Sequence, residues 1–142
     1  ITAAAGCAAS VGRPRTHRDH ADGVVMVSGH EADGKAPGGF GADWAQLARS
    51  GKTVVVYMGA TRAATIADRL IANGLEAETP VAVIENGTLP GQRVLAGSLW
   101  QLPDIVADGN VGSPALIVIG AVARLAQDAE RPAEALHAAL AV

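Results

Sequence analysis

Residues 53–74, Thr-Val-Val-Val-Tyr-Met-Gly-Ala-Thr-Arg-Ala-Ala-Thr-Ile-Ala-Asp-Arg-Leu-Ile-Ala-Asn-Gly, hold a complete strand and helix. The first five residues are β-branched, apolar or aromatic throughout, which predicts a strand buried on both faces. Across 61–73 the apolar residues recur at the i, i+3, i+4, i+7 spacing of an amphipathic helix. Gly74 is the expected residue just past its C-terminus. This stretch therefore predicts a strand–helix unit of an α/β fold.

The same kind of unit recurs on both sides of this stretch. Short apolar runs predict further strands at 24–28, 81–84, 92–97 and 115–119. Helices are expected from Thr2 to Gly12 and at 43–49, 99–107 and 133–140, with Pro103 tolerable only in a first turn. Asn86-Gly87 is a turn pair that predicts a hairpin. Strands and helices thus mostly alternate, and we predict an α/β domain with a mixed β-sheet sandwiched by helices.

Composition places limits on size and partners. The 142 residues fit a single domain, 1–142, with a flexible Gly-rich loop at 31–42. Hydrophobic residues make up 49% and aromatic residues only 3%, so a core of small aliphatic side chains is expected. The net charge is −3 and there is no basic stripe, which argues against nucleic acid as a partner. No apolar run reaches the roughly 18 residues of a membrane span.

Cysteine usage and the first residues bear on compartment and completeness. Cys7 is the only cysteine, which excludes a disulfide within the chain and argues against a cysteine-based metal site. A single thiol fits a reducing cytoplasm. The chain opens at Ile1 without an initiator methionine or a signal peptide. This start predicts a fragment of a longer protein.

Three segments carry side chains that suit chemistry. Thr-His-Arg-Asp-His at 16–20 could bind an anion, transfer protons or form a solvated polar loop; two histidines alone make a metal site the weakest reading. Tyr57-Met58-Gly59 follows a buried strand, where ligands of open α/β sheets bind and where Gly59 would admit a close ligand. Glu-Asn-Gly-Thr at 85–88 also follows a strand, and Gly87 there could adopt a positive φ. The plain alternatives are ordinary turns at both places, and a surface charge for Arg93.

Taken together, these segments resemble one family. The motifs that carry the resemblance are Ile-Thr-Ala-Ala-Ala-Gly-Cys at 1–7, Thr-His-Arg-Asp-His-Ala at 16–21, Ser-Gly-His at 28–30, Asp43-Trp44, Val-Val-Tyr-Met-Gly at 55–59, Ala-Ala-Thr-Ile-Ala at 63–67, Pro-Val-Ala-Val-Ile-Glu-Asn-Gly-Thr at 80–88, Gln-Arg-Val at 92–94 and Ser-Pro-Ala-Leu-Ile-Val-Ile-Gly at 113–120. In this order they are similar to the second half of the uroporphyrinogen-III C-methyltransferases. These are tetrapyrrole methylases, found alone or fused within sirohaem synthase.

The resemblance implies a fold and an activity. The fold would be the C-terminal domain of the tetrapyrrole methylase fold, with the cofactor bound between two domains. The activity would be transfer of two methyl groups from S-adenosyl-L-methionine to uroporphyrinogen III, through precorrin-1 to precorrin-2, with S-adenosyl-L-homocysteine as product. Sirohaem or cobalamin would be the end product of the pathway. A cytoplasmic homodimer is the family expectation for the full-length parent.

The resemblance also implies roles for individual residues. Cofactor contacts are expected from Thr2, Ala3, Met58, Gly87 and Ala115. His17 and Arg18 are expected to bind the carboxylates of the tetrapyrrole, which arginine suits, and Met58 would border the substrate as well. No metal is expected.

The departures from the family pattern bear on activity. The family's first domain, where the catalytic residues are expected, has no counterpart in this sequence. An isolated fragment is therefore expected to be inactive. The alternatives are a non-catalytic module that binds a ligand or dimerises, and another tetrapyrrole (precorrin) methylase.

Overall fold

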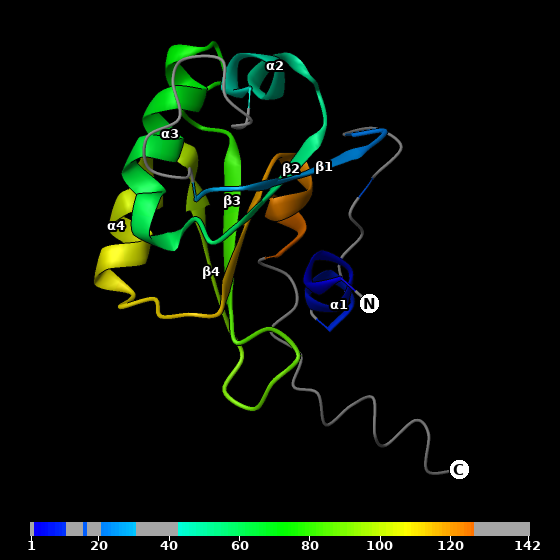
Figure 1. The fold of residues 1–142 in the computed structure, drawn as a ribbon, viewed down its shortest axis with the longest axis vertical. Coiled ribbons are helices and arrows are strands. Elements are labelled where there is room, and N and C mark those ends of the chain that lie inside the picture. The colour runs from blue at the N-terminus through cyan, green and yellow to red at the C-terminus, as the bar shows by residue number, and fades with distance from the viewer. Residues whose placement is uncertain (1, 11–15, 17–20, 31–42, 127–142) are drawn as a thin grey trace.

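A computed structural model describes residues 2–10, 16, 21–30 and 43–126, and Figure 1 shows their arrangement. Five strands form a mixed sheet in the order β1-β2-β5-β3-β4. Their bounds are β1 Val24–Ser28, β2 Thr53–Tyr57, β3 Pro80–Glu85, β4 Arg93–Ser98 and β5 Ala115–Ile119. The predicted α/β class with a mixed sheet is confirmed. That 1–142 is one domain stays a prediction.

The directions of the strands bring several chain segments to one edge of the sheet. β1 pairs parallel to β2, while β5 runs antiparallel to both β2 and β3. β4 completes the predicted hairpin by pairing antiparallel to β3, with Glu85 opposite Arg93. The carboxyl ends of β1, β2 and β3 therefore lie at the same edge as the amino end of β5. Ligands of open α/β sheets bind at such an edge.

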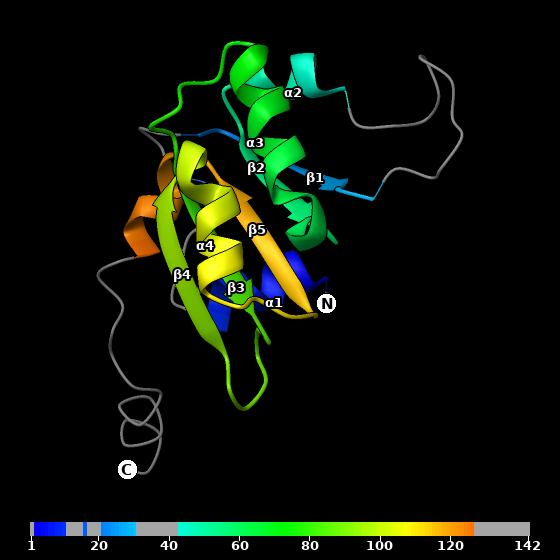
Figure 2. The same ribbon diagram turned by 90° about the vertical axis from the view of Figure 1, so that its left-hand side faces the viewer.

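Helices cover both faces of the sheet (Figures 1 and 2). One face packs against α2 (Trp44–Arg49), α3 (Ala63–Ala72) and α4 (Leu102–Asp108), and its core is aliphatic, with Ile66, Leu70 and Ile117 at its centre. On the other face lie α1 (Ala3–Ser10) and the 3₁₀ helix η3 (Ala121–Ala126). Small α1 side chains, such as Ala4, pack there against strand residues. The core is thus largely aliphatic, as expected, but small side chains prevail only where α1 packs, and the core under α2, α3 and α4 contains larger Leu and Ile side chains and Trp44.

The ends of the helices follow local sequence signals. α3 ends as predicted: Gly74 has φ 101°, its N–H donates to Ile71 O at 3.0 Å, and Leu75 N–H donates to Leu70 O at 3.0 Å. This is the Schellman arrangement, and glycine favours it because a positive φ costs little without a Cβ. Pro103 lies in the first turn of α4, the position where its missing N–H is tolerated.

Some predicted segments differ or fall outside the described residues. The helix predicted at 61–73 begins as the 3₁₀ helix η1 (Ala60–Arg62), and a 3₁₀ helix η2 (Leu99–Gln101) precedes α4. The loop at 31–42, the helix at 133–140 and the end of the first helix at Gly12 all lie outside the described residues. Among the described residues, none of the helices is long and apolar enough to cross a membrane.

Candidate functional site

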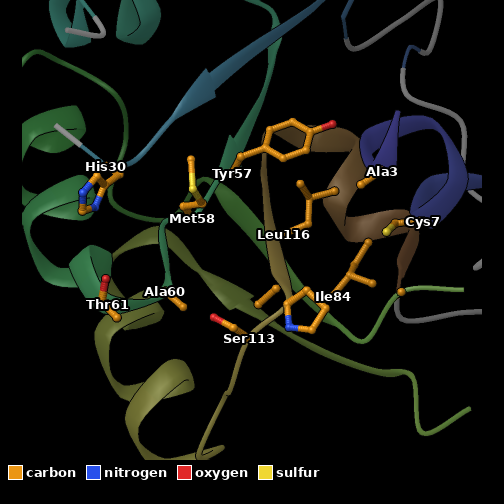
Figure 3. Close-up of a pocket in the computed structure, with 13 residues that line it drawn as sticks. Ala3, Cys7, His30, Tyr57, Met58, Ala60, Thr61, Ile84, Ser113 and Leu116 are labelled. Atoms are coloured by element: carbon orange, nitrogen blue, oxygen red, sulfur yellow. The ribbon is translucent and has the colours of Figure 1, made fainter. Parts of the chain in front are cut away.

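A pocket of about 420 Å³ lies at the sheet edge where the carboxyl ends of β1, β2 and β3 meet the start of β5. Figure 3 shows that its side chains come from several distant segments. The lining residues are Ala3, Cys7, His30, Tyr57, Met58, Ala60, Thr61, Ile84, Gly87, Ser113, Pro114, Ala115 and Leu116. Most of them are small or apolar. The pocket therefore suits a ligand with an apolar body and few polar groups.

Four of the five residues predicted as cofactor contacts line this pocket: Ala3, Met58, Gly87 and Ala115. The fifth, Thr2, lies next to it, because its hydroxyl is hydrogen-bonded to the phenol of the pocket residue Tyr57. The fold thus brings together positions that are more than 110 residues apart in sequence. The predicted substrate residues His17 and Arg18 lie outside the described residues.

Met58 has an unusual backbone and an unusual exposure. Its φ is +53°, in the left-handed region that few residues other than glycine adopt. Its side chain is 63% exposed although it is apolar. In Figure 3 the thioether of Met58 stands between His30 and Tyr57. Backbone strain of this kind is often found at ligand sites, and the turn holds an apolar side chain at the pocket mouth.

The two glycines of the candidate segments are needed for space, which corrects our expectation for both. Gly87 does not have a positive φ; its neighbours Asn86 and Thr88 do, at 50° and 70°. A Cβ at Gly87 would instead overlap Cys7 Sγ, because α1 packs directly on this turn. A Cβ at Gly59 would point into the core, 2.9 Å from Ile117 Cδ1, and Gly59 does not line the pocket. Close packing, and not the approach of a ligand, explains Gly59.

Tyr57 holds the start of α1 against the pocket. Its phenolic oxygen accepts a hydrogen bond from Ala4 N at 2.8 Å and pairs with the Thr2 hydroxyl. The first N–H groups of a helix have no partner within the helix and are usually capped by a side chain nearby in sequence. Here the cap for one of them comes from β2, 53 residues away. Tyr57 therefore fixes Thr2 and Ala3 at the edge of the pocket.

We predict that Tyr57→Phe lowers the free energy of unfolding by about 1 kcal/mol, the typical value of a lost cap or hydrogen bond. The ring keeps its apolar contacts, but Ala4 N–H loses its acceptor. Urea unfolding of the two proteins measures the difference. Thr2→Val, which keeps the phenol in place for Ala4, is the matched control and should cost less. Equal losses in the two variants would contradict a capping role for Tyr57.

The pocket also contains groups that could titrate or coordinate. Burial raises the pKa of the Cys7 thiol, so it stays protonated at neutral pH and is a poor nucleophile. His30 and Thr61 form a more polar end of the pocket in Figure 3, away from Cys7 and Ala3. Within the described part of the chain, no group of three or more His, Cys, Asp or Glu side chains could hold a metal ion. Binding and orientation, rather than covalent chemistry, fit this side-chain set.

Glu85 is a buried carboxylate beside the pocket. Its Oε1 accepts a hydrogen bond from Gly112 N at 2.6 Å, and its Oε2 pairs with Arg93 Nε. The hydrogen bonds from Arg93 and from the Gly112 backbone lower the pKa of Glu85 below its ordinary value of 4.5. The side chain of Arg93 is 46% exposed, so it is a surface charge, but one whose guanidinium pairs with a buried acid.

Because the pKa of Glu85 is lower in the folded state, its charge stabilises the fold above about pH 4.5, the ordinary value. This stabilisation is lost as the pH falls through the lowered folded pKa. We therefore predict that the wild-type chain melts at a higher temperature than Glu85→Gln at pH 7, and that the gap narrows below pH 4.5. Calorimetric melts from pH 7 to pH 3 test this. A gap that stays constant over that range would contradict it.

Several lining residues were not among the predicted contacts: Cys7, His30, Tyr57, Ala60, Thr61, Ile84, Ser113, Pro114 and Leu116. Most lie inside or beside the motifs that carry the family resemblance. His30, for example, ends the Ser-Gly-His motif, and Ser113 begins the Ser-Pro-Ala motif. Apart from Cys7, which lies in the predicted first helix, their position inside or close to the end of a predicted strand was the available signal. Only the strand order shows that these ends meet.

Comparison with known protein families gives a match to tetrapyrrole (corrin/porphyrin) methylases over residues 1–103. Siroheme synthase from Tolumonas auensis is 52% identical over 127 residues, which are 89% of this chain and 26% of that protein. Siroheme synthase from Nitrosomonas europaea is 46% identical over 127 residues, again 89% of this chain and 26% of that protein. The chain spans about a quarter of the length of these curated relatives.

Solved structures show the same similarity. A uroporphyrin-III C-methyl transferase from Thermus thermophilus, complexed with S-adenyl homocysteine, is 33% identical with a TM-score of 0.64. The match covers 82% of this chain and 49% of that one. A cobalt precorrin-4 methyltransferase has a TM-score of 0.75 at 21% identity, covering 90% of this chain and 51% of that one, and shows the shared fold. The chain thus spans about half the length of these solved proteins.

Proposed function

The chain belongs to the tetrapyrrole methylase family, and from this premise we propose that it forms one wall of the S-adenosyl-L-methionine site of a uroporphyrinogen-III C-methyltransferase. The whole enzyme would methylate uroporphyrinogen III at C2 and C7, through precorrin-1 to precorrin-2, for sirohaem or cobalamin synthesis. We further propose, on the resemblance alone, that this enzyme is a cytoplasmic homodimer.

One observation supports this proposal above the others. Ala3, Met58, Gly87 and Ala115, each expected from the family resemblance to contact the cofactor, line a single pocket. The character of the pocket also fits the cofactor. Ala3, Gly87 and Ala115 have little or no side chain, which leaves space for a nucleoside, and Met58 offers a polarisable sulfur. The turns at 58 and 86–88 follow the carboxyl ends of β2 and β3, so their backbone groups lie at the same edge of the sheet.

S-adenosyl-L-methionine supplies an electrophilic methyl group on a sulfonium. The residues of this chain would hold and orient the two reactants, because an in-line displacement depends on alignment and on the exclusion of water. Ala3, Ile84 and Leu116 present apolar surface that displaces water from the pocket. His17 and Arg18 remain our candidates for binding substrate carboxylates. The residues that move protons are expected in the other half of the enzyme.

The proposal predicts that the chain alone binds S-adenosyl-L-homocysteine either not at all or no more tightly than about 1 mM, because half of the site's contacts are absent. Isothermal titration calorimetry measures this directly. Free energy of binding depends on enclosure, and a ligand left open on one side loses much of it. Micromolar binding by the chain alone would show that it builds a complete site and would contradict our proposal of half a site.

A hybrid protein that contains both halves of the site tests whether this chain supports binding. It joins the first half of the Thermus thermophilus methyltransferase to this chain, which replaces the matching half of that enzyme. We expect the hybrid to bind S-adenosyl-L-homocysteine in the micromolar range. Met58→Ala in the hybrid should weaken binding, whereas Met26→Ala, another exposed methionine but outside the pocket, should not. A folded hybrid with no affinity would count against the methyltransferase and favour a non-catalytic module.

A further inference from the structure

The Glu85–Arg93 ion pair connects three chain segments behind the pocket. Glu85 ends β3 and Arg93 begins β4. Besides pairing with Glu85, Arg93 donates from Nη2 to the backbone carbonyls of Gly109 at 2.8 Å and Asn110 at 3.3 Å. Glu85 in turn accepts from Gly112 N at 2.6 Å. The two side chains therefore tie both strands of the hairpin to the turn that follows α4.

Two of these segments, the end of β3 and the turn that follows α4, lead directly into the pocket wall. Gly112 is followed by Ser113, Pro114 and Ala115, all of which line the pocket. Glu85 is followed by Asn86, whose N–H donates to Pro114 O at 2.9 Å, and then by the lining residue Gly87. Neither Glu85 nor Arg93 lines the pocket itself. Their contacts are thus with the backbone of the wall and not with the space a ligand would fill.

The choice of a charged pair has a physical reason. Glu85 is buried, and a buried carboxylate is costly unless its oxygens are hydrogen-bonded. Hydrogen bonds to ionised groups are shorter and stronger than neutral ones, so they hold a backbone segment more firmly. The planar guanidinium reaches a carboxylate and two carbonyls at once, which the single ammonium of lysine does not. Glutamine keeps the shape of Glu85 but not its charge.

We propose that Glu85 and Arg93 are a positioning pair, which holds the Gly112–Ala115 segment and the Asn86–Gly87 turn in the shape that the methyl donor requires. This inference rests on the proposed function, since it takes the pocket to be the S-adenosyl-L-methionine site. It adds two residues that act on the ligand through the backbone of the wall.

The first test measures how readily the wall segments Gly112–Ala115 and Asn86–Gly87 open locally, without any ligand. Amide hydrogen exchange by NMR on the full chain compares wild type with Glu85→Gln and Arg93→Lys. We expect amide exchange at Gly112 and Asn86 to become about tenfold faster in both variants, because fewer hydrogen bonds then have to break before this segment opens locally. The amide of Leu70 in α3 should not change. Asp22→Asn is the matched control, since it removes an exposed ion pair with Lys52 (3.0 Å) far from this wall in sequence.

The second test measures the affinity for the ligand. In the hybrid described above, Glu85→Gln and Arg93→Lys should each weaken the Kd for S-adenosyl-L-homocysteine by about tenfold, since small misplacements of contacting groups are costly. The double variant should be little worse than either single one, because the two side chains act as one unit. Asp22→Asn should leave the Kd unchanged. Measurements are made well below the melting temperature of each variant, so that all molecules are folded.

The outcomes separate this inference from the function on which it rests. Faster exchange confined to the wall together with a weaker Kd supports the positioning pair. Unchanged exchange at Gly112 and Asn86, or faster exchange throughout the chain including Leu70, overturns it. Faster exchange with an unchanged Kd also overturns it, because the pair would then serve the fold alone. A wild-type hybrid that does not bind the ligand counts against the proposed function instead, and the inference falls with it.

Discussion

Gly87→Ala is expected to lower the free energy of unfolding by about 1–3 kcal/mol, the range for an extra carbon forced into a packed site. A Cβ at this position would overlap Cys7 Sγ and would lie 3.1 Å from Cys7 Cβ and 3.3 Å from Ile84 Cγ2. Cys7 is itself buried and has little room to move. In the hybrid, the same change should abolish measurable binding of S-adenosyl-L-homocysteine, because the turn at Gly87 and the α1 wall are pushed apart.

Two further variants test whether the overlap with Cys7 causes the loss of stability in Gly87→Ala. In Gly87→Ala combined with Cys7→Ala the overlapping sulfur is gone, so the double variant should regain part of the lost stability, a coupling that a double-mutant cycle measures. Gly6→Ala is the control on α1, the helix that contains Cys7, since its Cβ would meet only Thr88 Cγ2 at 3.5 Å. This change should be neutral or stabilise α1 by up to about 1 kcal/mol through helix propensity. Additive losses at Gly87 and Cys7 would contradict the packing argument.

Ile66→Ala is expected to have the largest effect on stability, a loss of about 2–5 kcal/mol. Ile66 is 1% exposed, and it reaches from α3 to Gly29 and Gly59, which follow β1 and β2: its Cδ1 would lie 3.2 Å from a Cβ at Gly29 and 3.0 Å from one at Gly59. Its removal leaves a cavity next to Gly59, the residue after Met58. Against a total stability of about 5–15 kcal/mol, this loss is large.

Urea unfolding measures the effect of Ile66→Ala, with Ile71→Ala as the matched control. Ile71 lies on the same helix but is only partly buried, so its truncation removes less contact and should cost under about 2 kcal/mol. Similar losses in the two variants would show that Ile66 does not fill the space behind the pocket. Because the cavity would lie next to Gly59, which follows Met58 in the chain, we also expect Ile66→Ala to weaken ligand binding in the hybrid, and Ile71→Ala not to.

Local patterns in the sequence were enough for the secondary structure. The period of apolar residues separated α3 from β2, and Gly74 and Pro103 marked helix ends, because these signals act between residues a few positions apart. The predicted strands and α-helices were found throughout the described residues with boundaries shifted by a few residues, but the 3₁₀ helices at Ala60–Arg62, Leu99–Gln101 and Ala121–Ala126 were not predicted as such. The family motifs likewise lie in the sequence and needed no coordinates.

The reasons behind individual residues were predicted less well. Gly87 and Gly59 were singled out correctly but explained by backbone freedom or ligand approach, whereas neighbouring side chains determine both. The pairing of Arg93 with the buried Glu85 and the capping role of Tyr57 were not foreseen. In each case the partner is distant in sequence or on another element: Cys7 for Gly87, Ile117 for Gly59, Ala4 for Tyr57. Nothing in a local pattern specifies such partners.

The sequence by itself determined the α/β class, the succession of strands and helices along the chain, and the family motifs. The resemblance that these motifs carry also named four residues that line the pocket. The tertiary structure decided that β5 lies between β2 and β3, so that Ala115 lines the same pocket as Met58 and Gly87, and that α1 adds Ala3 and Cys7 to this pocket. It also decided that Glu85 and Arg93 hold the wall. The physical reason is that propensity and periodicity act over a few residues, whereas strand order and close packing depend on the burial of the whole chain at once.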